Sequence, residues 1–268
     1  MFFIISRGVC EMFRLLATVL FAMTASWVVA EPQTGLQIVE KAKQNGKGFE
    51  DMTHKVKMIL IDDKGETTER EMLVKAMTDT NGDAYSMSIF TAPRRENGIS
   101  LLTVAEKGGD DKQYLYLPST RRVKRITSSN KGSSFRGSEF TFEDLSDQNV
   151  ADYRFELVKE APCGDQTCFV VDRFPKSGES GYSKTQMWID TVYYRPIKAD
   201  FFDQDGKLLK TMETDNYRLF NEKFWNPETV TMANHQSGNS TKMVSLELKM
   251  NTGLRTSEFT ELAMRNWR

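Results

Sequence analysis

The chain has 268 residues, with 36 Lys or Arg against 37 Asp or Glu, for a formal net charge of −1. With 39% hydrophobic residues and so little net charge, the composition excludes a disordered chain. A nucleic-acid binder normally needs a surplus of basic residues to neutralise phosphates, so we expect no nucleic-acid partner. Three cysteines are too few for a disulfide-built scaffold.

The first 30 residues have the pattern of a secretory signal peptide. Arg14 precedes an uncharged apolar run, and the small residues Val28 and Ala30 stand at the −3 and −1 positions before Glu31. The run has about 16 residues, fewer than the roughly 20 that a membrane-spanning helix needs. We therefore predict export with cleavage after Ala30. A permanent N-terminal anchor is the alternative.

Cys163 and Cys168 follow the predicted signal peptide and flank a Gly164-Asp165 turn. Export permits a disulfide, and a hairpin at this turn would bring the two thiols face to face. Free thiols or a metal site are the alternatives. Zinc would need two more ligands, and no other Cys or His lies nearby in the sequence, so we expect no metal site.

One helix is signalled near the start of the mature chain. Thr34 and Gln37 have the spacing of a capping box, and apolar residues follow at helical spacing until Asn45-Gly46 ends the pattern. Beyond this point the apolar period changes to two residues, most clearly over 244–250. Repeated alternation between Asp-Gly, Asn-Gly and Ser-Gly turns predicts about 11 antiparallel strands with one apolar face. Such a sheet hides that face by curling into an unclosed barrel with the helix as a cover, in a single domain over residues 31–268.

The stretch from Asp111 to Asp147 is unlike the rest of the chain. Tyr116-Leu117-Pro118 leads into the basic run Arg121-Arg122-Val123-Lys124-Arg125-Ile126. A Gly-Ser-x-Phe-x-Gly-Ser-x-Phe pattern over 132–140 follows, ending in Glu143-Asp144-Leu145. Together with Trp-Ile-Asp at 188–190 and Tyr-Arg-Pro-Ile at 194–197, these motifs resemble LolA-like outer-membrane lipoprotein-sorting proteins. The resemblance is to the large periplasmic branch of that family, and it spans essentially the whole mature chain.

This resemblance implies a half-barrel whose apolar concavity is covered by helices and shelters acyl chains in the periplasm. The implied partners are lipoprotein or lipid acyl chains, an inner-membrane exporter and an outer-membrane acceptor, with no cofactor. The chain is longer than the minimal carriers of the family, so a different lipid cargo stays open. The alternative function is a non-transporting envelope sensor, or an accessory partner of a membrane exporter, that uses the same hollow.

Apolar residues on the alternating strands are the candidates for the lipid cavity. Methionine is frequent among them and suits an adaptable pocket, although ordinary core packing is the alternative. The candidates are Met58, Leu60, Met72, Val74, Met87, Ile89, Phe155, Leu157, Trp188, Leu246 and Leu248.

The central motif supplies two further sets of candidate residues. We expect the Gly132–Gly137 loop to pass close to another segment, with Phe135 as a plug or core anchor, and 140–145 to form a short helical turn. The basic strand residues Arg121, Arg122, Lys124 and Arg125 would pair with Glu139, Glu143 and Asp144, bind anionic head groups, or form a solvated strand face.

No catalytic residue is predicted. The chain has no Gly-x-Ser-x-Gly elbow and no glycine-rich phosphate loop before a helix. Its two histidines, His54 and His235, lie on strand-like segments without a nucleophile pattern. We therefore predict a binding protein and not an enzyme.

Overall fold

The computed structural model describes residues 33–46, 49–109 and 111–267. The signal peptide predicted for residues 1–30 lies outside these ranges and stays a prediction. From Gln33 onward the chain forms one compact unit. No helix in the described ranges is long and apolar enough to cross a membrane.

The helix α1 (Gly35–Asn45) begins where the sequence predicts. The Thr34 side chain accepts a hydrogen bond from the Gln37 N–H, and the Gln37 side chain accepts one from the Thr34 N–H, which completes the capping box. At Gly35 a Cβ atom would lie 2.8 Å from the backbone nitrogen of Leu157. Only glycine therefore lets the helix pack this closely against the sheet.

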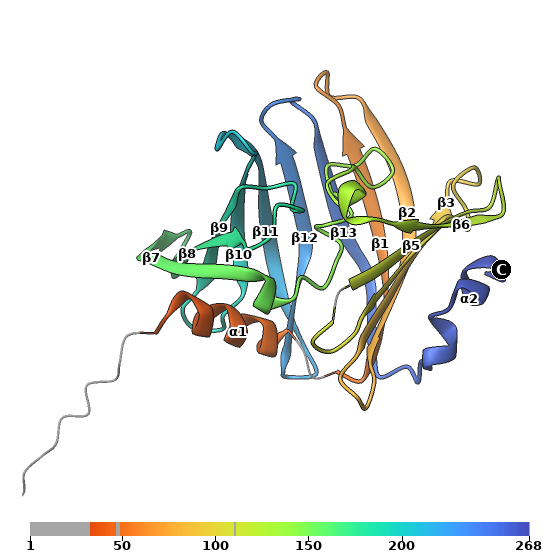
Figure 1. The fold of residues 1–268 in the computed structure, drawn as a ribbon, viewed down its shortest axis with the longest axis horizontal. Coiled ribbons are helices and arrows are strands. Elements are labelled where there is room, and N and C mark those ends of the chain that lie inside the picture. The colour runs from red at the N-terminus through yellow and green to blue at the C-terminus, as the bar shows by residue number, and fades with distance from the viewer. Residues whose placement is uncertain (1–32, 47–48, 110, 268) are drawn as a thin grey trace, which may run out of the picture. The chain divides into compact units, whose positions relative to one another are not determined.

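Within the described residues, thirteen strands form one antiparallel sheet in the order β6-β5-β4-β3-β2-β1-β13-β12-β11-β10-β9-β8-β7 (Figure 1). The strands are β1 (Asp51–Ile61), β2 (Thr67–Thr78), β3 (Ala84–Ala92), β4 (Ser100–Ala105), β5 (Asp111–Leu117), β6 (Arg122–Ile126), β7 (Tyr153–Cys163), β8 (Gln166–Pro175), β9 (Lys184–Asp190), β10 (Pro196–Phe202), β11 (Leu208–Phe220), β12 (Phe224–Asn234) and β13 (Ser240–Met250). The short helical elements are η1 (Ser128–Asn130), η2 (Val150–Asp152), η3 (Thr256–Glu258) and α2 (Glu261–Arg265).

The predicted fold class is confirmed, with one unclosed antiparallel sheet and an N-terminal helix. The described sheet has thirteen strands and not about eleven. Two strands lack regular alternation in the sequence. β4 (Ser-Leu-Leu-Thr-Val-Ala) is buried at nearly every position, so its apolar residues do not alternate with polar ones, and β11 carries polar residues in succession over 213–216. The predicted disulfide between Cys163 and Cys168 is present in the β7–β8 hairpin, with Cα atoms 5.9 Å apart.

The edge strands β6 and β7 are consecutive in the chain, and residues 127–152 connect them. Residues 131–147, which we call the plug segment, pack against both halves of the sheet. Phe135 and Phe142 join a cluster on β1–β6, whereas Phe140 joins one on β10 and β12. Because one segment contacts both halves, the sheet curves around it (Figure 1).

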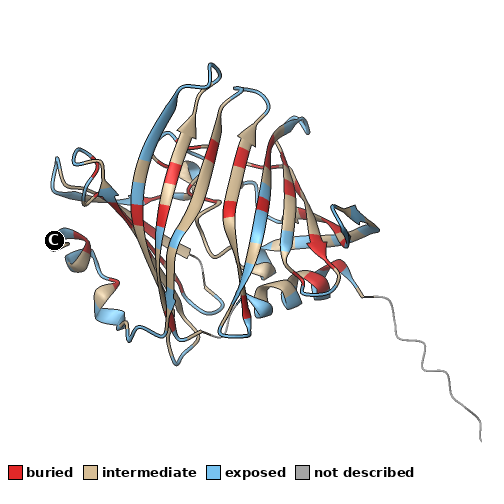
Figure 2. Ribbon diagram, turned by 180° about the vertical axis from the view of Figure 1, so that it is seen from behind, coloured by how far each residue is buried: buried red, intermediate tan, exposed pale blue. Residues whose placement is uncertain are grey.

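We call the face toward the plug segment the inner face. Directly paired residues of neighbouring strands point to the same side of a sheet. Met243 pairs with Met58, and Met232 pairs with Met212, so the inner face carries residues from both halves of the sheet. The C-terminal residues, including η3 and α2, pack on the outer face of β3–β6, where Phe259 and Met264 are buried. Seen from behind, the buried positions gather along the middle of the strands, with exposed residues toward the hairpins (Figure 2).

Candidate functional site

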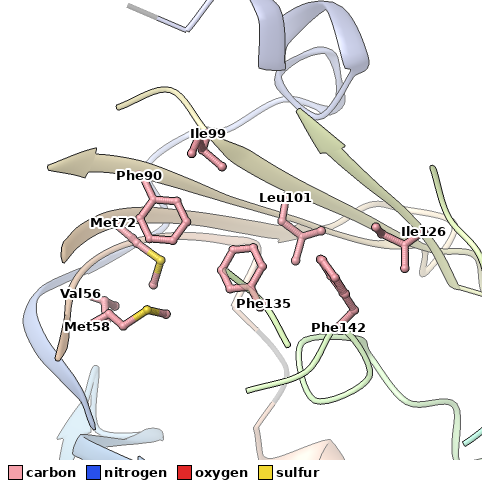
Figure 3. Packing of buried hydrophobic residues seen from close by; sticks show 9 residues of the cluster. All are labelled: Val56, Met58, Met72, Phe90, Ile99, Leu101, Ile126, Phe135 and Phe142. Atoms are coloured by element: carbon pink, nitrogen blue, oxygen red, sulfur yellow. The ribbon is translucent and has the colours of Figure 1, made fainter. Parts of the chain in front are cut away.

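The plug segment buries aromatic side chains against the inner face. Phe135 is fully buried, and its ring stacks on Phe90 with centroids 5.6 Å apart. Phe142 meets Phe135 edge-on at a centroid distance of 5.8 Å. Figure 3 shows Phe135 between Phe142 and the strand residues Phe90 and Met72. Phe135 therefore anchors the plug segment to one half of the sheet.

A buried ion pair attaches the plug segment to the other half. Lys210 Nζ on β11 lies 2.7 Å from Asp144 Oδ2 and donates to the Glu139 carbonyl at 2.9 Å. The Lys210 and Asp144 side chains are only 2% and 5% exposed. The Tyr182 hydroxyl donates to Asp144 Oδ1 at 3.0 Å. Burial, together with the Asp144 charge, raises the pKa of Tyr182 far above its usual value, so this hydroxyl keeps its proton.

Glu143 makes a further attachment to the loop before β9. Its carboxylate accepts hydrogen bonds from Ser180 Oγ at 2.6 Å and from the Gly181 N–H at 2.8 Å. A Cβ atom on Gly181 would lie 3.3 Å from the Cα atom of Gly132, so the two backbones approach closely. The predicted close passage of the Gly132–Gly137 loop is confirmed.

Two adjoining hollows lie between the plug segment and the inner face. The first has a volume of about 190 Å³ and is lined by Val56, Met72, Val74, Ser86, Ser88, Leu101, Thr103, Phe135, Leu145 and Met243. The second has about 260 Å³, shares Ser86, Thr103 and Leu145 with the first, and continues to Phe49 and Gly46 after α1. Ligand pockets usually start near ~300 Å³, so a long apolar ligand would need both hollows joined. Because Leu145 lines both, its side chain stands where they would merge.

A polar pocket of about 520 Å³ is lined by residues of both edge strands of the unclosed sheet, β6 and β7. It shares Ser146 with the second hollow, and charged groups line it, among them Arg125, Lys131, Lys176 and Asp111. Burial raises the pKa of Asp111, although the Asp147 N–H donates to its carboxylate. The site therefore runs from an apolar hollow to a polar pocket, an arrangement that suits an amphiphilic ligand.

Comparisons with known proteins identify the family. A family profile described as "Uncharacterized protein" matches residues 82–266. A solved domain from Vibrio parahaemolyticus, named for outer membrane lipoprotein sorting, is 37% identical with a TM-score of 0.83, and the match covers 87% of this chain and 98% of that one. The chain belongs to the outer membrane lipoprotein-sorting protein family. This agrees with the LolA-like resemblance of the central motif. No curated protein sequence matches the chain.

Two further solved structures share the lipoprotein-sorting fold at lower identity. A DUF1329 family protein from Desulfovibrio piger is 24% identical with a TM-score of 0.81, and the match covers 86% of this chain and 97% of that one. A LolA superfamily protein from Nitrosomonas europaea is 20% identical with a TM-score of 0.68, over 85% of this chain and 98% of that one. At these identities the two structures support the fold alone.

In this member of the lipoprotein-sorting family, most predicted cavity residues lie on the inner face. Only Met72 and Val74 line the first hollow directly. Phe155 and Leu157 pack near α1 at the other half of the sheet. The inner-face set is Met58, Leu60, Met72, Val74, Phe155, Leu157 and Leu248.

Four predicted cavity residues lie on the outer face, so their assignment to the cavity is wrong. Met87 and Ile89 pair with Lys75 and Leu73 and pack beneath the C-terminal residues. Trp188 pairs with Lys198, whose Nζ lies 4.5 Å from the centroid of the Trp188 ring. Leu246 is 52% exposed.

A register irregularity explains the position of Leu246, and the cover of the outer face explains that of Met87 and Ile89. The shift between Lys55 and Val56 leaves Leu246 unpaired on β13, so it turns toward a separate outer hollow with Leu73 and Trp267. On β3 the alternating apolar residues Met87 and Ile89 lie on the outer face because the C-terminal residues cover it, whereas the inner face carries Ser86, Ser88 and Phe90. Sequence periodicity separates the faces of a strand but does not say which one is inward.

The signature residues Gly132, Phe135, Gly137, Phe140, Glu143 and Asp144 all lie in the plug segment. The predicted turn over 140–145 is supported by a Leu145 N–H to Thr141 carbonyl hydrogen bond of 3.3 Å. Of the alternatives for the basic strand, pairing with the acids of this segment is wrong, because these acids bind other residues. Glu139 accepts from Asn234 at 2.8 Å, while Glu143 and Asp144 bind Ser180 and Lys210. Arg121, Arg122, Lys124 and Arg125 are exposed.

Sequence reasoning missed several residues of the site. Leu101 on β4 and Met243 on β13 line the first hollow, beside Leu145, which the sequence predicted to point inward. Lys210 was also missed, although a lysine between the apolar Leu209 and Met212 is the kind of signal that could have marked a buried ion pair.

Both histidines contact hydroxyl groups. His54 Nε2 lies 2.8 Å from Ser245 Oγ, and burial lowers the pKa of His54. His235 Nε2 lies 2.8 Å from Thr211 Oγ1, which donates to Asp200 at 2.7 Å. Here the hydroxyl stands between carboxylate and imidazole, unlike a catalytic triad, in which the imidazole takes the central place.

Proposed function

We propose that the protein is a periplasmic carrier that shelters the acyl chains of a lipoprotein or another lipid and moves them toward the outer membrane. The observation that carries this proposal is the pair of adjoining hollows between the inner face and the plug segment. The lipoprotein-sorting name of the 37% identical Vibrio domain supports it. An inner-membrane exporter and an outer-membrane acceptor are the partners that such a route requires.

The physical basis is the transfer of methylene groups out of water. Each buried CH₂ gains about 0.8 kcal/mol, so an acyl chain binds wherever an apolar space can be opened for it. Met72 and Met243 line the first hollow and can adjust their shape through three rotatable bonds. The polar pocket between β6 and β7 would hold the polar end of the same molecule.

The plug segment supplies a means of release. Phe135 and Leu145 occupy the space that a longer acyl chain needs, so cargo and plug compete for the same inner face. Meanwhile the Lys210–Asp144 and Glu143–Ser180 contacts keep the segment attached to the other half of the sheet. A displaced plug would therefore return to its place once an acceptor draws the lipid away.

A hollow-filling variant tests the proposal. Val74 lines the first hollow, whereas its neighbour Leu73 lines the outer hollow on the opposite face. The protein is expressed with its leader, purified from the periplasm, and its bound lipids are extracted and identified by mass spectrometry. We expect wild type and the control Leu73→Phe to carry acyl lipid, and Val74→Phe to lose most of it.

Two outcomes would count against this function. A wild-type protein that is empty of lipid but bound to a protein partner would favour the sensor or accessory role. Equal lipid content in Val74→Phe and wild type would place the cargo outside the inner hollow.

A further inference from the structure

We propose that β6, with the turn before it, docks the protein on an anionic lipid bilayer. The docking surface consists of Arg121, Arg122, Lys124 and Arg125, together with Leu262 and Arg265 of α2. This inference rests on the proposed carrier function for its purpose, but the docking itself can be measured separately.

Arg121 and the three β6 cations are exposed, have one sign and border the sheet edge from both faces. Arg122 and Lys124 pair with the inner-face residues Leu117 and Leu115, whereas Arg125 pairs with Tyr114 on the outer face, where α2 packs. Residues 121–126 contain no acid, and none of the four joins an ion pair within the described part of the chain. The acids of the plug segment do not neutralise them, because Asp144 and Glu143 bind Lys210 and Ser180. Charge at this edge is therefore available to a partner.

The helix α2 extends the surface with one more cation and an apolar side chain. Arg265 Nη1 donates to the Arg121 carbonyl at 3.4 Å, which places α2 beside β6. Leu262 on the same helix is 66% exposed. Glu261 is an acid on α2 itself, and Glu106 is paired with Lys112. On the pocket side, Arg125 shares the lining of the polar pocket with four acids, Asp111, Glu143, Asp152 and Glu179. Cations flanking an exposed apolar residue match the interfacial zone of an anionic membrane.

Protection of a sheet edge does not by itself explain this charge. Charged residues on an edge strand discourage pairing with other chains. The opposite edge, β7, carries both signs, with an ion pair between Arg154 and Glu156, and Lys159 next to Glu160. The β7 edge carries both positive and negative side chains, so protection of an edge does not require charges of one sign. The purely positive charge of β6 therefore points to an anionic partner.

The surface lies where a carrier would need it. Arg125 also lines the polar pocket between β6 and β7, so docking through β6 would turn the mouth of that pocket toward lipid head groups. Cargo could then pass between the bilayer and the apolar hollow without crossing open water.

The test is co-sedimentation of the mature protein with phosphatidylcholine vesicles made with or without phosphatidylglycerol. We expect binding to the phosphatidylglycerol vesicles alone, weakened by added salt because exposed charges are screened. Removing two cations in Arg122→Gln/Lys124→Gln should lower the partition coefficient about 30-fold. The control Lys64→Gln/Lys159→Gln removes two exposed lysines elsewhere and should bind like wild type.

Equal binding by the β6 variant and wild type, or no binding to phosphatidylglycerol vesicles, would overturn the docking proposal. The extraction experiment reports separately on the carrier function. If the purified protein contains lipid but does not bind vesicles, the docking proposal is wrong and the carrier function stands. If a lipid-free protein binds vesicles, the carrier function is wrong and the docking proposal stands.

Discussion

Replacing Phe135 with alanine should have two effects of opposite sign. Phe135 is fully buried, stacks on Phe90 and also forms part of the wall of the first hollow. Its removal should destabilise the protein without ligand, because the plug segment loses its anchor. The same removal should widen the hollow and strengthen lipid binding.

The size of the first effect follows from the burial of the ring. Phe-to-Ala substitutions in cores cost about 3–5 kcal/mol, including the cavity left behind. Because the ring also packs against the rings of Phe90 and Phe142, we expect the free energy of unfolding to fall by about 4 kcal/mol. The second effect follows from volume, since the hollow of about 190 Å³ gains the space of a phenyl ring.

The assay is urea unfolding with and without a short-chain phospholipid kept below its micelle concentration. Phe259→Ala is the control, because Phe259 is also buried but packs on the outer face. Both variants should be less stable than wild type, and only Phe135→Ala should gain more stability from the lipid than wild type does. Equal lipid stabilisation of the two variants would refute the assignment of Phe135 to the ligand site.

Two further predictions concern buried charges. Lys210→Met should lower the free energy of unfolding in urea by about 3–5 kcal/mol, since Asp144 is left buried without its cation, and adding Asp144→Asn should restore part of the loss. A double variant no more stable than Lys210→Met would contradict this. Burial alone would raise the pKa of Asp190, but hydrogen bonds from Arg195 and the Tyr193 N–H lower it overall. Ionised Asp190 therefore stabilises the folded state fully at a pH above its pKa in the unfolded chain, about 3.9. This stabilisation is lost as the pH falls through the lower pKa of Asp190 in the folded protein. Acid titration of stability should be shallower in Asp190→Asn than in wild type, and an identical slope would argue against this role.

Local signals in the sequence were sufficient to predict the helix, the hairpin disulfide and the sheet class. The capping box at Thr34, the Gly164-Asp165 turn and two-residue alternation each act over a few neighbouring residues. The close passage of the Gly132–Gly137 loop also followed from its glycines, which allow two backbones to approach.

What the sequence could not predict depends on register and on distant contacts. Met87 and Leu246 were assigned to the cavity because alternation alone cannot tell the inner from the outer face. The outer face of Met87 is set by the distant C-terminal residues that cover it, and that of Leu246 by a register shift between two strands. Lys210 and Asp144 are 66 residues apart, so no local pattern connects them. The sequence marked residues 131–147 as a distinctive motif, but it left open whether its acids pair with the basic strand, because charge alone does not determine a partner.

The central claim is that acyl chains bind between the inner face and the plug segment. Its most direct test is photo-crosslinking of the mature protein with a phospholipid whose acyl chain carries a diazirine, followed by mapping of the modified peptides. We predict adducts on the strand around Val74, on the strand around Leu101 and on residues 135–145. Adducts concentrated on the peptides of Leu246 and Trp267, which line the outer hollow, or none above background, would contradict the claim.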